Sequence, residues 1–171
     1  MNERKNIVTA KGNPVTLLGP ELKAGDPAPG FTVLSPEMEE KSLSDFSGKI
    51  KVISVTPSLD TPVCDLQLKE FNSQASSLTD DCRVINISMD LPFALSRFCL
   101  VNDIKDVITY SDHRDASFGK AYGVLIKELR LLARSVFIIG RDDIIKYLEI
   151  VPKMSEQPDY ERAFAQLKKI T

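Results

Sequence analysis

The stretch PSLDTPVC, residues 57–64, joins an apolar run to an amphipathic one. The run Val52–Thr56 before it is typical of a buried β-strand, and the proline that follows ends such a strand. Thr61 is a residue type favoured at helix N-caps, and Pro62 suits the first helical position. The segment therefore predicts a strand, a tight connection and a helix that carries Cys64 in its first turn.

The predicted helix has an apolar face and one stabilising ion pair. Apolar residues recur at helical spacing, which predicts a buried side: Val63, Leu66, Phe71, Ala75 and Leu78. Asp65 and Lys69 form an acid-before-base pair at i,i+4. We expect the helix to run to about Leu78, before the break at 79–81.

The rest of the chain alternates predicted strands and helices. A hairpin of 7–10 and 15–18 is expected first, and a connector at 25–30 follows. Further strands are predicted at 31–34, 84–88 and 107–110, a second hairpin at 136–139 and 144–150, and helices at 92–99, 115–122 and from Pro158 onward. This order predicts an α/β fold of three layers with a mixed central sheet flanked by helices. At about 150 residues per domain, 171 residues predict one domain, 1–171, with the hairpin at roughly 6–18 and the core at roughly 19–171.

Composition excludes several classes of function. Hydrophobic residues make up 43% and charged residues 27%, and the formal net charge is −2. We therefore expect no nucleic-acid partner, which would need a basic surface, and no membrane partner. The amino terminus carries charges without a following apolar run, so no secretory signal is predicted and a cytoplasmic location is expected.

The cysteines and histidine limit the possible metal and redox sites. The sequence has three cysteines, Cys64, Cys82 and Cys99, and no two of them form a C-x-x-C pair. His113 is the only histidine. A two-histidine zinc helix is excluded, and we expect no metal. We interpret Cys82 as a structural or surface thiol and His113 as a loop residue. The acidic group Glu37, Glu39 and Glu40 is interpreted as a charged surface turn.

Cys64 is the candidate nucleophile. Backbone N–H groups and the helix dipole at a helix start favour a thiolate. Asp60 and Asp65 lie close in sequence, and their negative charges oppose it. A guanidinium would have to outweigh them, and Arg134 is the candidate from elsewhere in the chain.

The order Pro57-x-x-x-Thr61-x-x-Cys64 resembles the active-site signature of the peroxiredoxins. The segment 90–99, which ends at Cys99, resembles the resolving-cysteine segment of one subfamily, the bacterial thiol peroxidases. The run 131–135 resembles their segment with the active-site arginine, here Arg134. The resemblance covers about residues 6 to 170. One departure is Asp65, where this subfamily usually has a small residue.

The resemblance implies a thioredoxin-like fold and a hydroperoxide reductase without metal, haem or flavin. Cys64 would attack the peroxide, helped by Arg134 and the Thr61 hydroxyl, with Pro57 sheltering the sulfur. Cys99 would then form a disulfide with Cys64, and thioredoxin would reduce it. The subfamily also implies a homodimer, with 111–122 as a candidate interface. The preferred peroxide stays open.

Two other readings remain. A disulfide oxidoreductase would share the fold, but it normally uses C-x-x-C, and Gln67 occupies the second cysteine's position. A non-catalytic thioredoxin-fold binding or chaperone module would not need Thr61, Arg134 and both cysteines. A mechanism like that of the glutathione peroxidases is disfavoured, because the sequence has no tryptophan for its active site.

Overall fold

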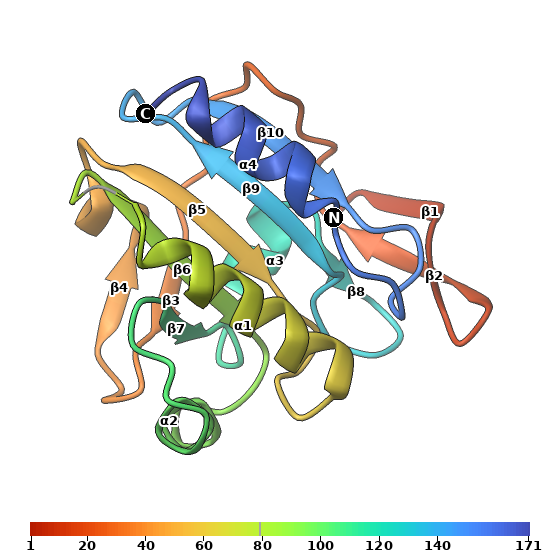
Figure 1. Ribbon diagram of the computed structural model, residues 1–171. Helices are drawn as coiled ribbons and strands as arrows, with labels where there is room; N and C mark the ends of the chain where they lie inside the picture. Colours follow the sequence, from red (N-terminus) through yellow and green to blue (C-terminus); the bar gives the residue numbers. More distant parts are fainter. Residues whose placement is uncertain (79) are drawn as a thin grey trace.

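A mixed seven-stranded sheet forms the centre of the molecule (Figure 1). The computed structural model describes residues 1–78 and 80–171, so Thr79 of the expected break lies outside the described residues. The strand order is β10 (Ile145–Ile150), β9 (Ser135–Ile139), β5 (Ile50–Val55), β6 (Cys82–Ser88), β7 (Ile108–Ser111), β3 (Thr32–Leu34) and β4 (Glu40–Ser42). Strands β5, β6 and β7 are parallel, and the other pairs are antiparallel. The predicted α/β fold with a mixed sheet is confirmed.

Helices cover both faces of this sheet. In Figure 1, α1 (Pro62–Ala75) and α4 (Tyr160–Lys168) lie on one face, and α3 (Ser117–Ala121) lies behind the sheet. Helix α2 (Pro92–Val101) packs against β7. Alternate residues of the central strands enter two apolar clusters: Ile53 and Ile85 join one, and Val52 and Val84 the other. Burial on both faces explains why β5 is buried along its whole length.

The buried side of α1 differs from the prediction in both position and length. The helix ends at Ala75, three residues before Leu78. Leu66, which we placed on the apolar face, is 60% exposed, whereas Gln67 and Leu68 are fully buried. The inward face follows Cys64, Gln67, Leu68 and Phe71, because a polar amide with internal partners can occupy a core position.

Three short elements were missed by sequence reasoning. These are β4, the 3₁₀ turn Leu43–Phe46 and β8 (Leu125–Ile126). The glutamates of the acidic group are exposed, as predicted, and Glu37 lies in a turn, whereas Glu40 is the first residue of β4. Two- and three-residue strands show no hydrophobic period, so only pairing with a neighbour defines them.

The predicted amino-terminal hairpin is confirmed and belongs to a second, smaller sheet. Strands β1 (Glu3–Ala10) and β2 (Asn13–Leu18) pair antiparallel, and β2 also pairs with β8. The chain after the hairpin passes Gly123 so closely that an added Cβ would lie 2.0 Å from the Pro20 carbonyl oxygen. Gly123 also has a φ of +67°, so both space and conformation require glycine there.

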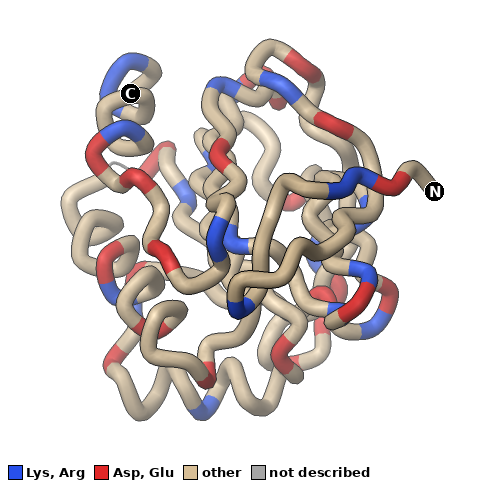
Figure 2. Tube along the Cα trace, turned by 90° about the vertical axis from the view of Figure 1, so that its right-hand side faces the viewer, with Lys and Arg blue, Asp and Glu red and all other residues tan. Residues whose placement is uncertain are grey.

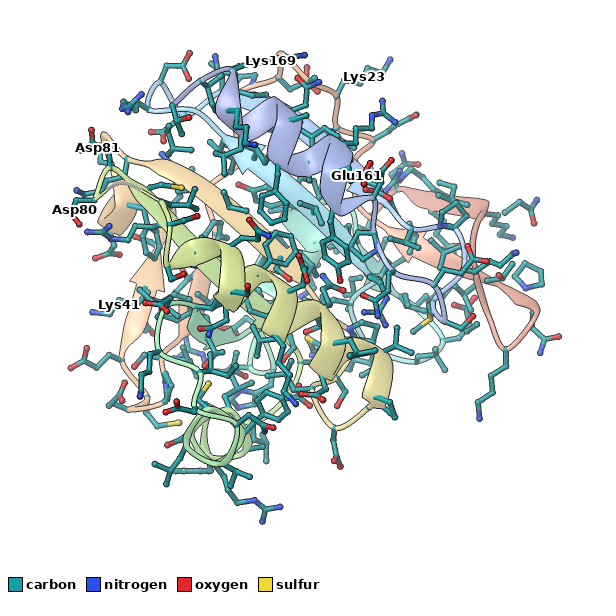
Figure 3. The ribbon with its side chains drawn as sticks, in the orientation of Figure 1. Lys23, Lys41, Asp80, Asp81, Glu161 and Lys169 are labelled. Carbon is teal, nitrogen blue, oxygen red and sulfur yellow. The ribbon has the colours of Figure 1, made fainter. Side chains whose placement is uncertain are left out.

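Charge is spread over the surface. Figure 2 shows basic and acidic residues interspersed along the trace, and the charged side chains labelled in Figure 3 project outward from the body of the molecule. Among the described residues, no helix is long and apolar enough to cross a membrane. Because charges of both signs are interspersed in this view, the search for a site starts from the buried polar groups.

Replacing Gly123 by alanine should destabilise the fold more than the same change at Gly12. Both glycines have positive φ, but an added Cβ at Gly12 would meet nothing within 4 Å. We expect Gly12→Ala to cost about 1 to 2 kcal/mol of unfolding free energy through backbone strain alone. Gly123→Ala should cost about 1 to 3 kcal/mol more, because it adds a steric collision. Urea unfolding measures both, and equal losses would contradict the close approach.

Candidate active site

Cys64 lies where the sequence predicts it, in the first turn of α1. Thr61 occupies the N-cap and Pro62 the first helical position. The cysteine is 1% exposed, and its Sγ accepts a hydrogen bond from Nη2 of Arg134 at 3.3 Å. The first turn of a helix and a guanidinium therefore both lie beside the same sulfur.

Arg134 is held from two sides. It directly precedes β9 and is 1% exposed. Its Nη1 donates to Oε1 of Gln67 at 2.6 Å, whereas Nε and Nη2 donate to the Met154 carbonyl oxygen at 3.2 and 3.0 Å. The planar fork of a guanidinium allows little rotation when so many donors are engaged. Nη2 is therefore kept pointing at Cys64.

The surroundings of this guanidinium favour a charged sulfur. Its other partners are an amide oxygen and a backbone carbonyl, which carry no formal charge. An unpaired buried charge is destabilising by several kcal/mol. Among the hydrogen-bond partners of Arg134 in the described residues, only Cys64 can become an anion, so a thiolate there would supply a counter-charge to the guanidinium.

Gln67 is a site residue that sequence reasoning missed. It lies three residues after Cys64, on the same side of α1, and is fully buried. Its Nε2 donates to Oγ of Ser54 at 2.9 Å and to the Val55 carbonyl at 3.3 Å, so its Oε1 faces Arg134. A polar residue one turn after the nucleophile was the available signal. In the sequence, Gln67 served only as evidence that the chain has no C-x-x-C pair.

Asp65 turns away toward Lys69. Its Oδ2 accepts from the lysine Nζ at 2.9 Å, which confirms the predicted i,i+4 pair. Asp60 is exposed to solvent, where water screens its charge. The two carboxylates that oppose a thiolate are therefore weakened, one by an ion pair and the other by solvent.

Thr61 and Pro57 lie at the two ends of the connection between β5 and α1. Thr61 is exposed, and its hydroxyl donates to the Ser58 carbonyl at 3.1 Å. It occupies the N-cap position without the side-chain capping bond typical there. Pro57 is buried just after β5. The expected strand terminator is in place, and the capping role of Thr61 is limited to its backbone.

Cys99 lies apart from Cys64, on a different helix. Helix α1 packs on β5 and β6, whereas α2, which carries Cys99, packs on β7. Cys99 is half-buried, and its Sγ lies 3.5 Å from Oγ1 of Thr109 on β7. Burial raises the pKa of the Cys99 thiol, and the Thr109 hydroxyl opposes that shift. Both cysteines are free thiols in this structure.

Asp90 ties the segment before Cys64 to the segment that leads into α2. Its Oδ1 accepts from Oγ of Ser58 at 2.7 Å, and its Oδ2 accepts from the Leu59 amide and from Oγ of Ser88, both at 2.8 Å. A cleft of about 670 Å³ lies between the 58–60 connection and α2. Its wall includes the exposed apolar side chains of Phe93 and Val101. In the sequence Asp90 is only the first residue of the segment 90–99, and its link to Ser58 and Leu59 was not predicted.

The remaining candidates lie elsewhere. Cys82 is buried at the start of β6, and burial raises the pKa of its thiol to about 11, as expected for a structural thiol. His113 lies in a loop, with Nδ1 2.8 Å from Oγ of Ser111. Over residues 1–78 and 80–171, no three acidic, cysteine or histidine side chains are grouped to hold a metal ion.

Comparison with known proteins places these features in a family. Residues 23–164 match the Redoxin family. The thiol peroxidase of Listeria innocua is 53% identical over 162 residues, which cover 95% of this chain and 98% of that protein. The thiol peroxidase of Bacillus subtilis is 55% identical over 155 residues, covering 91% and 92%. The crystal structure of a peroxiredoxin-like protein from Aquifex aeolicus matches with a TM-score of 0.91 at 40% identity and covers all of both chains.

Removing the guanidinium should slow the reaction of Cys64 with iodoacetamide. In a Cys82→Ser, Cys99→Ser background, Arg134→Ala should lower the alkylation rate at neutral pH by about tenfold, because a charged hydrogen-bond donor to the sulfur is lost. The matched control is Arg141→Ala, since Arg141 lies in an exposed turn and donates to the Ile170 carbonyl. The measurement is the alkylation rate against pH. An unchanged profile in Arg134→Ala would contradict the role of the guanidinium.

Proposed function

The chain belongs to the Redoxin family, as a peroxiredoxin enzyme of the thiol peroxidase type, and from this we propose that Cys64 reduces hydroperoxides and that Cys99 resolves the product. The observation that carries the proposal is the 3.3 Å hydrogen bond from Arg134 Nη2 to Cys64 Sγ inside a buried site. Hydrogen peroxide and organic hydroperoxides are the substrates, and water or an alcohol is the product.

In the first step the Cys64 thiolate attacks one oxygen of ROOH. The O–O bond breaks, the sulfur gains OH as a sulfenic acid, and the departing RO⁻ takes a proton to become ROH. The sulfur is oxidised and the peroxide is reduced by two electrons. Negative charge moves from the sulfur to the departing oxygen, so a fixed donor beside the sulfur lowers the barrier. Nη2 of Arg134 is such a donor.

Thr61 and Pro57 have supporting roles in this proposal. The Thr61 hydroxyl has one proton, which it donates to the Ser58 carbonyl in the resting structure. When that hydroxyl rotates toward a bound peroxide, it donates to a peroxide oxygen instead of the Ser58 carbonyl. Pro57, buried beside the 58–60 connection, limits the access of water to the sulfur.

In the second step the Cys99 thiol attacks the sulfenic sulfur. An S–S bond forms between Cys64 and Cys99, and the hydroxyl leaves as water with the thiol proton. A dithiol then reduces the disulfide by exchange, and thioredoxin is the reductant we propose. Burial raises the pKa of the Cys99 thiol, so an opening of α2 that exposes the sulfur to water would remove that cause and favour the reactive thiolate.

The second step requires movement. A disulfide needs Cα atoms about 4.4 to 6.8 Å apart, but the two cysteines lie on separate intact helices over different strands. We propose that the first turn of α1, or α2, or both, unwind after oxidation. The contacts that hold these segments in the reduced structure are those of Asp90 with Ser58 and Leu59, and that of Cys99 with Thr109.

The chain as a whole, residues 1–171, acts as one domain in this proposal. We propose a homodimer in the cytoplasm, with 111–122 as the contact region. The alternative, a non-catalytic binding or chaperone module, has no use for a guanidinium buried against a cysteine.

Serine in place of Cys64 should abolish peroxide reduction. Consumption of hydrogen peroxide is measured with a complete thioredoxin system, and Cys82→Ser is the matched control because Cys82 is buried away from Arg134. We expect Cys64→Ser to lose all measurable turnover and Cys82→Ser to keep at least half. Substantial turnover in Cys64→Ser would overturn the assignment. Absence of turnover in the unmodified chain with every peroxide and dithiol tried would favour the binding module.

Peroxide treatment should loosen two segments. Amide hydrogen exchange should become faster in residues 60–66 and 93–102, because the disulfide cannot form while both helices are intact. The paired strands β5 and β6 serve as the internal control and should not change. Equal exchange in the reduced and oxidised protein throughout 60–66 and 93–102 would show that no such opening occurs.

A further inference from the structure

We propose that the amino-terminal hairpin is a positioning element for Arg134, and that Thr9 is the residue through which it acts. The hairpin touches neither Cys64 nor a bound peroxide in this account. Instead it fixes the carbonyl group that orients the guanidinium. This inference rests on the proposed role of Arg134 in peroxide reduction and adds a second group of residues to it.

The outer edge of β1 is hydrogen-bonded to the segment after β10. The Thr9 amide donates to the Pro152 carbonyl at 2.8 Å, and the Met154 amide donates to the Thr9 carbonyl at 3.1 Å. On its other side Thr9 faces Pro14 of β2, which has no amide hydrogen to donate. Both backbone groups of Thr9 are therefore committed to residues 152–154, and β1 forms a parallel bridge to Lys153.

Met154 links this edge to the active site. Its amide is bound by Thr9, and its carbonyl accepts from both Nε and Nη2 of Arg134. Only the φ and ψ angles of Met154 separate its amide, which is bound to Thr9, from its carbonyl, which binds Arg134. A shift of the 152–154 segment therefore moves the Met154 oxygen and, with it, the direction of Nη2.

The other edge of the same small sheet holds the backbone that carries Arg134. Strand β2 pairs with β8 through Leu17 and Ile126. Strand β8 in turn bridges to Leu132, and the Ala133 amide donates to the Val124 carbonyl at 2.8 Å. The sheet β1–β2–β8 thus fixes the chain just before Arg134 at one edge and the acceptor of its side chain at the other.

The shared donor explains why this matters for the sulfur. Nη2 lies 3.0 Å from the Met154 oxygen and 3.3 Å from Cys64 Sγ, so a single group serves both acceptors. If the Met154 oxygen is no longer fixed, the guanidinium can pivot about its bond to Gln67. Small errors in the placement of a catalytic group reduce rates strongly. The hairpin precedes residues 23–164, which match the Redoxin family. The support that it gives to Arg134 therefore comes from outside the matched region.

The test is a double-mutant cycle between Thr9 and Arg134. Thr9→Pro removes the amide that binds Pro152 and leaves the β2 side of the hairpin without a lost bond. We expect Thr9→Pro to slow the reaction of the reduced protein with hydrogen peroxide by about tenfold, and to lower Cys64 alkylation across the pH profile. In an Arg134→Ala background the same proline should change neither rate more than about twofold, because coupled residues are not additive.

Three control variants separate positioning from general destabilisation. Thr9→Val keeps both backbone bonds and loses only the 3.4 Å contact of its hydroxyl with Pro152, so it should react like the unmodified protein. Val33→Ala, in the buried part of β3, lowers stability away from Arg134 and should not alter the pH profile. Thr9→Gly keeps both backbone bonds but makes the strand more flexible. Its rate of reaction with hydrogen peroxide should lie between those of Thr9→Val and Thr9→Pro.

The outcomes distinguish this inference from the proposed function. If Arg134→Ala reacts as fast as the unmodified protein, the proposed function of Arg134 is wrong. If Arg134→Ala is slow but Thr9→Pro is not, or if the proline slows both backgrounds by the same factor, the hairpin does not act through Arg134. Should Thr9→Pro fail to fold, the order Thr9→Val faster than Thr9→Gly supports the inference, and equal rates for those two overturn it.

Discussion

The hydrogen bond from a buried guanidinium to a buried sulfur is the interaction on which the rest of the site depends. Arg134 and Cys64 are each 1% exposed, and Nη2 lies 3.3 Å from Sγ. A guanidinium in such a place is costly unless an anion compensates it. The other hydrogen-bond acceptors of Arg134 in the described residues are neutral, so among these partners Cys64 is the one that can carry a negative charge. Helix α1, the chain before β9 and the segment after β10 are all arranged around this pair.

Contacts around the pair fall into two classes with different consequences. Gln67, Ser54 and the Met154 carbonyl are anchored to the central sheet or to the hairpin, and they keep Arg134 in place. Asp90 and Thr109, in contrast, hold the two segments that the proposed disulfide requires to move. A guanidinium held in place beside two segments that can be released would serve both steps that we propose, the attack of Cys64 on peroxide and the disulfide between Cys64 and Cys99.

Sequence reasoning succeeded where a residue type has one local meaning. The proline and threonine before Cys64 predicted the helix start, and the alternation of apolar runs predicted the mixed sheet. It failed where the meaning of a residue depends on a partner distant in the chain. Gln67 faces Arg134, 67 residues away, and Asp90 faces Ser58, 32 residues away, so neither role is visible in a local pattern. The Met154 carbonyl is a backbone group, so no side-chain type in the sequence could have predicted its contact with Arg134. Leu66 was placed inside because its type is apolar, whereas the buried position belongs to a glutamine with internal hydrogen bonds.

Mapping the cysteines after one equivalent of hydrogen peroxide tests directly whether Cys64 is the residue oxidised first and Cys99 its disulfide partner. The reduced protein is mixed with peroxide, trapped with an alkylating reagent, digested and measured by mass spectrometry. We expect the chain to lose two hydrogen atoms and to give a linked pair of peptides that contain Cys64 and Cys99. Cys82 should be recovered as an alkylated thiol once the digest is denatured. A linked peptide containing Cys82, or an oxidised Cys99 beside an unmodified Cys64, would contradict it.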